Sequence, residues 1–227
     1  MNTLEKQPRI RSFSRRQGRI TPGQKVALES RWDKYCLDPE QAVNYSEVFE
    51  RTAPLVMEIG FGNGDSLATM AEANPQLNYI GIEVHKPGVG HLLLQLEQRQ
   101  LNNVRIYYHD AVEVLEQRIN DKQLSAVHLF FPDPWPKRRH HKRRIIRPEF
   151  MALIAKKLKP KGYFHAATDW ENYAKQMLRV LTHSDLLKNS SPTQDYCQRP
   201  SYRPLTKFEQ RGLRLGHGVW DLVFERS

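Results

Sequence analysis

Five acidic residues end or closely follow predicted β-strands, and their spacing is regular. They are Glu58, Glu83, Asp110, Asp133 and Asp169. The first three gaps are 25, 27 and 23 residues, each about the length of one strand–helix unit. In a parallel sheet such strand ends lie along one edge, which is where ligands bind in open α/β folds. Any one of these acids could instead cap a helix, and Asp110 in particular has the position for it.

A glycine-rich turn follows the first of these strands. Gly60, Gly62 and Gly64 come after the apolar run Leu55–Ile59, and a helical pattern begins at Asp65. Glycine permits positive φ and lets a ligand approach the main chain closely. The turn therefore predicts a seat for a nucleotide-like cofactor. A plain tight turn is the alternative for this stretch taken by itself.

The charges around the turn favour S-adenosylmethionine over a dinucleotide. Asp65 takes the place of the third glycine in a dinucleotide fingerprint, and Glu58 stands just before the first glycine. Two carboxylates repel a pyrophosphate but attract a sulfonium and an α-amino group. We expect Glu83 to accept both ribose hydroxyls and Asp110 to accept an adenine amino group. Glu58 and Asp133 would then face the methionine amine and the sulfonium.

The stretch Phe130–Lys137 reads Phe-Phe-Pro-Asp-Pro-Trp-Pro-Lys and is the candidate substrate loop. Its three prolines stiffen the backbone around one acid and one indole. A rigid loop that presents a carboxylate and a flat ring is suited to bind a nucleobase that is flipped out of its stack. The alternative is a rigid turn whose Trp135 packs in the core.

Two segments hold the excess positive charge of a chain whose formal net charge is +10. Residues 1–25 carry seven basic side chains against one acid, and residues 137–147 carry seven against none, so the rest of the chain is mildly acidic. Such clustering is typical of nucleic-acid binders, although solvated surface is the alternative. From the second segment we predict RNA contacts by Arg138, Arg139, His140, His141, Lys142, Arg143 and Arg144. His140 and His141 are adjacent and cannot share a helix face as paired ligands do, so no metal site is expected.

The elements that must position these residues alternate along the chain. Predicted strands lie at Leu55–Ile59, Leu77–Glu83, Val104–Asp110, Ser125–Phe131 and Tyr163–Thr168, with helices over Asp65–Asn74, Pro87–Leu101, Ala111–Ile119, Pro148–Leu158 and Trp170–Leu181. This alternation predicts an α/β fold with a mostly parallel sheet. We also expect a short helix over Pro39–Glu50 and a hairpin within Tyr202–Arg226.

Length and composition predict a single domain over residues 26–227, preceded by a flexible basic arm at 1–25. The chain has no apolar run of the length that spans a membrane and no apolar secretory signal. Its two cysteines, Cys36 and Cys197, form no Cys-x-x-Cys pair. Together these features favour a reducing cytoplasm, with no membrane association.

Motifs along nearly the whole chain resemble those of the bacterial tRNA (guanine-N7-)-methyltransferases. The matching pieces are Arg11-Ser-Phe-x-Arg-Arg-Gln17, Glu58-Ile-Gly-Phe-Gly-x-Gly64, Gly81-Ile-Glu-Val-His85, Phe131-Pro-Asp-Pro-Trp-Pro-Lys137, His140-His-Lys-Arg143, Thr168-Asp-Trp170, Thr206-Lys-Phe-Glu209 and Asp221-Leu-x-Phe-x-Arg226. The proline-rich loop and the Thr-Lys-Phe-Glu stretch are specific, whereas the glycine turn alone is not.

The resemblance implies a class I methyltransferase, with a Rossmann-like seven-stranded sheet and a reversed last strand. It implies S-adenosylmethionine as methyl donor and a guanosine in the tRNA variable loop as acceptor. The cofactor residues would be Glu58, Glu83, Asp110 and Asp133, and Asp133 would have the active-site role. The substrate residues would be Lys137, Asp169, Thr206, Lys207, Phe208 and Glu209. No metal and no obligatory protein partner are expected.

Guanine N7 carries an in-plane lone pair and no proton, so its methylation requires no general base. Alignment and electrostatics would then carry catalysis. Two other functions remain open at this point. One is a nucleic-acid methyltransferase that acts on an exocyclic amine, and the other is a basic RNA-binding protein that keeps the fold without catalysis.

Overall fold

Five parallel strands, whose carboxyl ends lie along one edge, form most of the sheet of this protein. The computed structural model describes residues 10–13, 18–206, 209–210, 212, 216 and 218–227. Within these ranges seven strands form one sheet in the order β3-β2-β1-β4-β5-β7-β6. The strands β1 to β5 pair in parallel, and β7 runs antiparallel to both β5 and β6. This arrangement confirms the predicted mostly parallel sheet with a reversed last strand.

The strands are β1 (Leu55–Ile59), β2 (Asn78–Ile82), β3 (Val104–Tyr107), β4 (Leu124–Phe130), β5 (Leu158–Thr168), β6 (Leu187–Asn189) and β7 (Trp220–Arg226). The helices are α1 (Pro22–Ser30), α2 (Trp32–Tyr35), α3 (Tyr45–Val48), α4 (Asp65–Ala73), α5 (Lys86–Gln98), α6 (Ala111–Gln117), α7 (Pro148–Lys157) and α8 (Glu171–Thr182), with a 3₁₀ helix, η1, at Arg138–Arg143. Among the described residues, no helix has the length and apolar character needed to cross a membrane.

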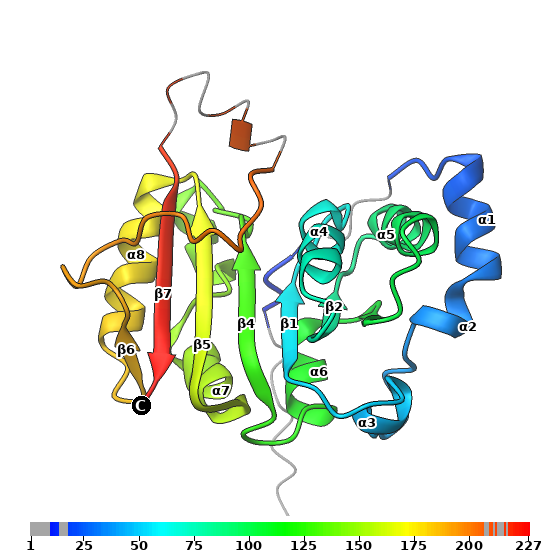
Figure 1. Ribbon diagram of the computed structural model, residues 1–227. Helices are drawn as coiled ribbons and strands as arrows, with labels where there is room; N and C mark the ends of the chain where they lie inside the picture. Colours follow the sequence, from blue (N-terminus) through cyan, green and yellow to red (C-terminus); the bar gives the residue numbers. More distant parts are fainter. Residues whose placement is uncertain (1–9, 14–17, 207–208, 211, 213–215, 217) are drawn as a thin grey trace, which may run out of the picture.

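Helices cover the two faces of the sheet unequally (Figure 1). On one face α6, α7 and α8 pack over a continuous apolar core that reaches from β3 to β6. On the other face α4 and α5, with α1 beyond them, cover the β1–β2–β3 side. The rest of that face, over β4, β5 and β7, is crossed by the segment that follows β6 (Figure 1). Contacts of Cys197 with Asp221 and of Tyr202 with His128 attach this segment to the sheet.

The central strands of the sheet are buried, and prolines and a capping box mark where helices begin. All five residues of β1 are buried, as expected for a strand with helices on both faces. Proline begins α1 and α7, where its missing N–H costs nothing, and Thr21 and Gln24 form a capping box at α1.

Two local predictions differ from the structure. The helix expected over Pro39–Glu50 is limited to α3, because Asn44 caps it through the backbone N–H of Ser46. The hairpin expected within Tyr202–Arg226 is wrong, since β7 pairs with β5 and β6 instead. The β-like pattern of β7 was real, but its partners lie earlier in the chain.

Candidate active site

The glycine turn has the geometry that a ligand requires. Gly60, Gly62 and Gly64 have φ of 72°, 60° and 79°, a region that favours glycine. A Cβ added to Gly60 or Gly62 would meet no described atom within 4 Å, so the space beside both is open. At Gly64 an added Cβ would come within 2.7 Å of Leu92 in α5. The first two glycines therefore leave room for a ligand, and the third allows helix packing.

Glu83 holds the turn in place. Its carboxylate accepts hydrogen bonds from the backbone N–H groups of Gly62 (2.8 Å), Val84 (2.6 Å) and His85 (2.9 Å). A carboxylate offers about four acceptor positions, so capacity remains for a further donor such as a ribose hydroxyl. Glu83 is thus a structural support of the turn as well as a candidate ligand.

Glu58 is the most perturbed acid of the site. It is 2% exposed within β1, and no described residue donates a hydrogen bond to its Oε2. Burial, followed by the charge of Glu83, raises the pKa of Glu58 from 4.5 to about 8. A cationic ligand would satisfy this carboxyl, because opposite charge favours its ionised form.

A cavity of about 510 Å³ opens at the carboxyl ends of the strands. Its wall includes Gly60, Gly62, Glu83 and Asp133, which the sequence predicted, and His109 and Ala111, which flank Asp110. Asp110 itself caps α6 by accepting from the N–H of Val112 at 2.8 Å. The open glycines and the carboxylates of Glu83 and Asp133 around this cavity fit a cationic nucleoside such as S-adenosylmethionine. Glu58, on the strand before the glycines, is not part of the cavity wall.

Residues near the N-terminus complete the cavity wall, and sequence reasoning did not assign them there. Ser12 and Phe13 line the cavity. The indole Nε1 of Trp135 donates to the Ser12 carbonyl at 3.1 Å, and the Arg143 guanidinium donates to the Phe13 carbonyl at 2.9 Å. That guanidinium also lies 3.9 Å above the Trp135 ring. The proline-rich loop and the basic run together hold residues 11–13 against the cavity.

The side chains of the basic run, residues 137–147, differ in their exposure to solvent. Arg138, Arg139 and Lys142 are exposed on η1, as a phosphate contact requires. Arg144 is 1% exposed, and its guanidinium donates to the Pro134 carbonyl (2.8 Å), Gln176 (2.5 Å) and Asn172 (2.9 Å). It also stacks on Tyr173 of α8. We therefore correct its predicted RNA contact to a structural role, in which it fastens the proline-rich loop to α8.

The remaining predicted substrate residues lie outside the cavity wall as the structure describes it. Asp169 is half-buried directly after β5, Lys137 is exposed, and Lys207 and Phe208 lie outside the described residues. The Thr206 hydroxyl accepts from the N–H of Glu209 at 3.1 Å. Glu209 is 3% exposed, and both of its oxygens accept from Arg203 at 2.7 Å. The described residues include no cluster of three or more side chains suited to hold a metal ion.

The sheet order, the glycine turn after β1 and the cavity at the strand ends define the fold of the class I S-adenosylmethionine-dependent methyltransferases. A solved structure described as the 16S rRNA methyltransferase KamB shares this fold, with a TM-score of 0.61, 14% identity and coverage of 83% of this chain and 95% of the other. The model of a family described as "Putative methyltransferase" matches residues 52–222. The chain belongs to the tRNA (guanine-N(7)-)-methyltransferase family. Proteins of that name from Shewanella amazonensis and Methylococcus capsulatus are each 58% identical over 219 residues, which is 96% of this chain and 92% and 95% of theirs.

Proposed function

We propose that this protein transfers the methyl group of S-adenosylmethionine to N7 of a guanosine in tRNA, in the variable loop. The observation that carries the proposal is the cavity that joins the glycine turn to Asp133, in a chain 58% identical to relatives named for this activity. As in the sequence analysis, we propose a single domain over residues 26–227 with a basic arm before it, acting in the cytoplasm.

The cofactor supplies an electrophilic methyl group on a sulfonium. In our proposal Glu58, Glu83 and Asp110 hold it, and the backbone of Gly60, Gly62 and Gly64 lies against it. The raised pKa of Glu58 supports this role, because a carboxyl whose buried oxygen has no donor among the described residues gains most from a nearby cation.

Asp133 would orient the base and stabilise the positive charge that develops on guanine. It is exposed to the cavity, and two prolines flank it, so its position is fixed before the base arrives. No proton leaves N7, so this carboxylate does not act as a base. Asp169 and Thr206 are proposed to contact the guanosine, as are Lys137, Lys207 and Phe208. Glu209, which is buried and bound to Arg203, is proposed to support this part of the site from behind. Arg138, Arg139, Lys142, His140 and His141 would contact the RNA backbone.

The decisive experiment incubates the protein with methyl-labelled S-adenosylmethionine and bulk tRNA that lacks 7-methylguanosine. Digestion to nucleosides and mass spectrometry then identify the methylated atom, and mass spectrometry of ribonuclease fragments identifies its position in the tRNA. Label in 7-methylguanosine from the variable loop supports the proposal. Label on an exocyclic amine would replace it with the first alternative. Binding of tRNA with no transfer and no cofactor binding would replace it with a non-catalytic RNA-binding protein.

A further inference from the structure

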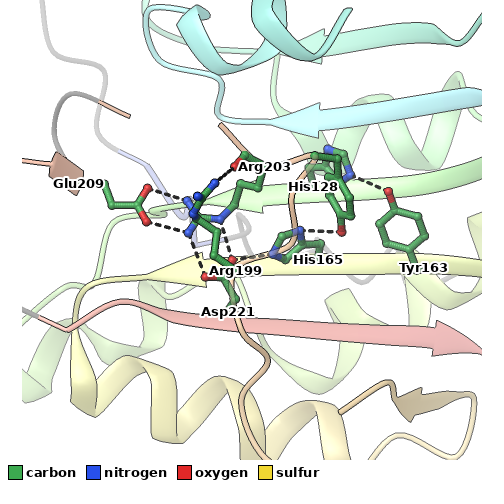
Figure 2. Close-up of polar contacts among 8 residues, drawn as sticks. His128, Tyr163, His165, Arg199, Arg203, Glu209 and Asp221 are labelled. Atoms are coloured by element: carbon green, nitrogen blue, oxygen red, sulfur yellow. Dashed lines mark hydrogen bonds and ion pairs between the residues drawn. The ribbon is translucent and has the colours of Figure 1, made fainter. Parts of the chain in front are cut away.

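Arg203 is a buried cation at the centre of a network that sequence reasoning did not detect (Figure 2). Its side chain is 1% exposed. Four of its N–H groups are used by two carboxylates. Nε and Nη2 donate to Asp221 at 2.6 and 2.9 Å, and Nη1 and Nη2 donate to Glu209 at 2.7 Å each. A guanidinium is suited to such a double fork because its donors are planar and rigid.

The network joins segments that are far apart in sequence. Asp221 belongs to β7, and its Oδ1 also bonds His165 of β5 at 2.8 Å. The other ring nitrogen of His165 bonds the Tyr202 hydroxyl at 2.9 Å. Tyr202 stacks on His128 of β4, with ring centroids 5.7 Å apart. The segment before Arg203 is therefore fixed across three neighbouring strands (Figure 2).

The same guanidinium touches the cavity wall. It lies 5.8 Å from the ring centre of Phe130 and 5.6 Å from that of Phe131, and both residues line the cavity. On its other side Glu209 is joined to Thr206, because the Glu209 N–H donates to the Thr206 hydroxyl at 3.1 Å and the Gln210 N–H donates to the Thr206 carbonyl at 2.9 Å. Arg203 thus connects the cavity wall to Glu209 and, through Glu209, to Thr206.

Charge balance supports this arrangement. Burial lowers the pKa of Arg203, but its hydrogen bonds to Glu209 and Asp221 outweigh burial and raise that pKa above its ordinary value. The Arg203 guanidinium therefore stays protonated. Without it, two carboxylates would be left buried together, which is costly. Glu209 consequently has one stable position, against Arg203.

We propose that Arg203 is a positioning residue for the methyl transfer, which holds Thr206 at the carboxyl edge of the sheet through Glu209. The inference rests on the proposed function, and it assigns Glu209 a different task from direct contact with guanine. In this arrangement Thr206 is presented to the tRNA, and Glu209 keeps it there.

The first test is Arg203→Lys, which keeps the charge but replaces the fork with a single point of contact. We expect kcat with tRNA to fall at least tenfold. The Kd for S-adenosylmethionine, measured by calorimetry, should change less than threefold, because Arg203 does not contact the glycine turn. Loss of cofactor affinity in parallel with kcat would mean general damage to the fold and would overturn the proposal.

A double-variant cycle with Thr206→Ala separates positioning from stability. If Arg203 acts through Thr206, the double variant Arg203→Lys/Thr206→Ala should have a kcat no more than threefold below that of the slower single variant. Independent roles would multiply the two losses, and that outcome would overturn the proposal.

Lys157→Met is the matched control. Lys157 is also a buried cation, 6% exposed, and its Nζ donates to the Ile119 carbonyl (2.6 Å) and to Asp121 (3.0 Å). It lies just before β5, at the edge of the sheet opposite the cavity. We expect this variant to lower the unfolding temperature, to leave kcat within twofold and to combine multiplicatively with Thr206→Ala. If Lys157→Met and Thr206→Ala also combine non-additively, the double-variant cycle measures only loss of stability, and this outcome would overturn the proposal.

A readout without tRNA distinguishes failure of this inference from failure of the proposed function. Hydrogen exchange of the Arg203, Glu209 and Gln210 amides should accelerate at least tenfold in Arg203→Lys, with the β4 and β5 amides unchanged. Should Arg203→Lys not fold, Glu209→Gln removes one carboxylate while Arg203 keeps Asp221, and the same acceleration is expected. Unchanged exchange in the folded variant overturns the positioning role. If exchange responds but the wild type methylates no tRNA, only the proposed function fails.

Discussion

Replacing Glu58 with glutamine should make the protein more stable at alkaline pH. The pKa of Glu58 is raised from 4.5 to about 8, chiefly by burial and also by the charge of Glu83. A carboxyl whose folded-state pKa is raised stabilises the fold fully below its unfolded pKa. That stabilisation is lost as pH rises from 4.5 towards 8. At about 1.4 kcal/mol per pKa unit, the wild type should lose roughly 4 kcal/mol relative to Glu58→Gln over this window.

The Glu58→Gln substitution also has a cost in folding stability that does not depend on pH. Its buried amide brings donors that need partners, at a cost of about 1–3 kcal/mol. We therefore expect Glu58→Gln to be slightly less stable than the wild type at pH 5, and more stable by about 1–3 kcal/mol at pH 8.5. Urea denaturation without cofactor at several pH values measures the crossing. The exposed Glu116→Gln serves as control, and its curve should follow the wild type.

Cofactor binding should favour the ionised form of the Glu58 carboxyl, which burial disfavours in the free protein. A cation beside Glu58 lowers its pKa, so the wild type should release up to about one proton per bound S-adenosylmethionine near pH 7. Calorimetry in two buffers of different ionisation enthalpy measures this release, which Glu58→Gln should abolish while it weakens binding. Parallel stability curves for the wild type and Glu58→Gln between pH 5 and 8.5 would refute the reasoning.

Three further outcomes are expected. Asp133→Asn should lower kcat by roughly two to three decades, with a smaller loss of tRNA affinity, and wild-type kcat at saturating cofactor should be flat from about pH 6.5 to 8.5. A log-linear rise that Asp133→Asn abolishes would instead indicate a general base. Replacing Arg138, Arg139 and Lys142 with Gln should flatten the salt dependence of tRNA affinity by roughly 0.7–0.9 log units for each phosphate that is no longer bound, whereas Arg144→Gln should destabilise the fold and leave the slope unchanged. An unaltered slope in the triple variant would make the run a solvated surface. Inosine in place of the target guanosine removes the 2-amino group, and its penalty should shrink in Asp169→Ala if Asp169 reads that amine. A full penalty in that variant would assign the amine to another residue.

Local patterns in the sequence were enough to predict the edge of the sheet at which the cavity opens. The strand before the glycine turn coincides with β1, and the turn has the positive φ values that its glycines indicated. Such features depend on neighbours within a few residues, which a sequence displays directly. Glu83 and Asp133 line the cavity because parallel strands bring their carboxyl ends together, whereas Glu58 and Asp110, expected at the same edge, are not part of its wall.

Features that depend on distant partners could not be predicted in this way. Arg144 looks like its neighbours in the basic run, and only its contacts with α8, 28 and 32 residues later, show that it is buried. Arg203 has no local signal of burial, since its partner Asp221 is 18 residues away. The motif that contains Asp221 matched the family, but a motif does not state which cation its acid holds.

The reversed direction of β7 has a consequence for how the protein acquires activity as it folds. Because β7 lies between β5 and β6, the sheet is incomplete until residues 220–226 insert. The same insertion brings Asp221 to Arg203 and His165. Since β7 runs opposite to β5, its first residues, and not its last, meet the edge with the cavity. Closing the sheet and assembling the Arg203 network are then one cooperative event. If that network positions the substrate residues as we propose, a partly folded chain without β7 should not act as a slow or promiscuous enzyme.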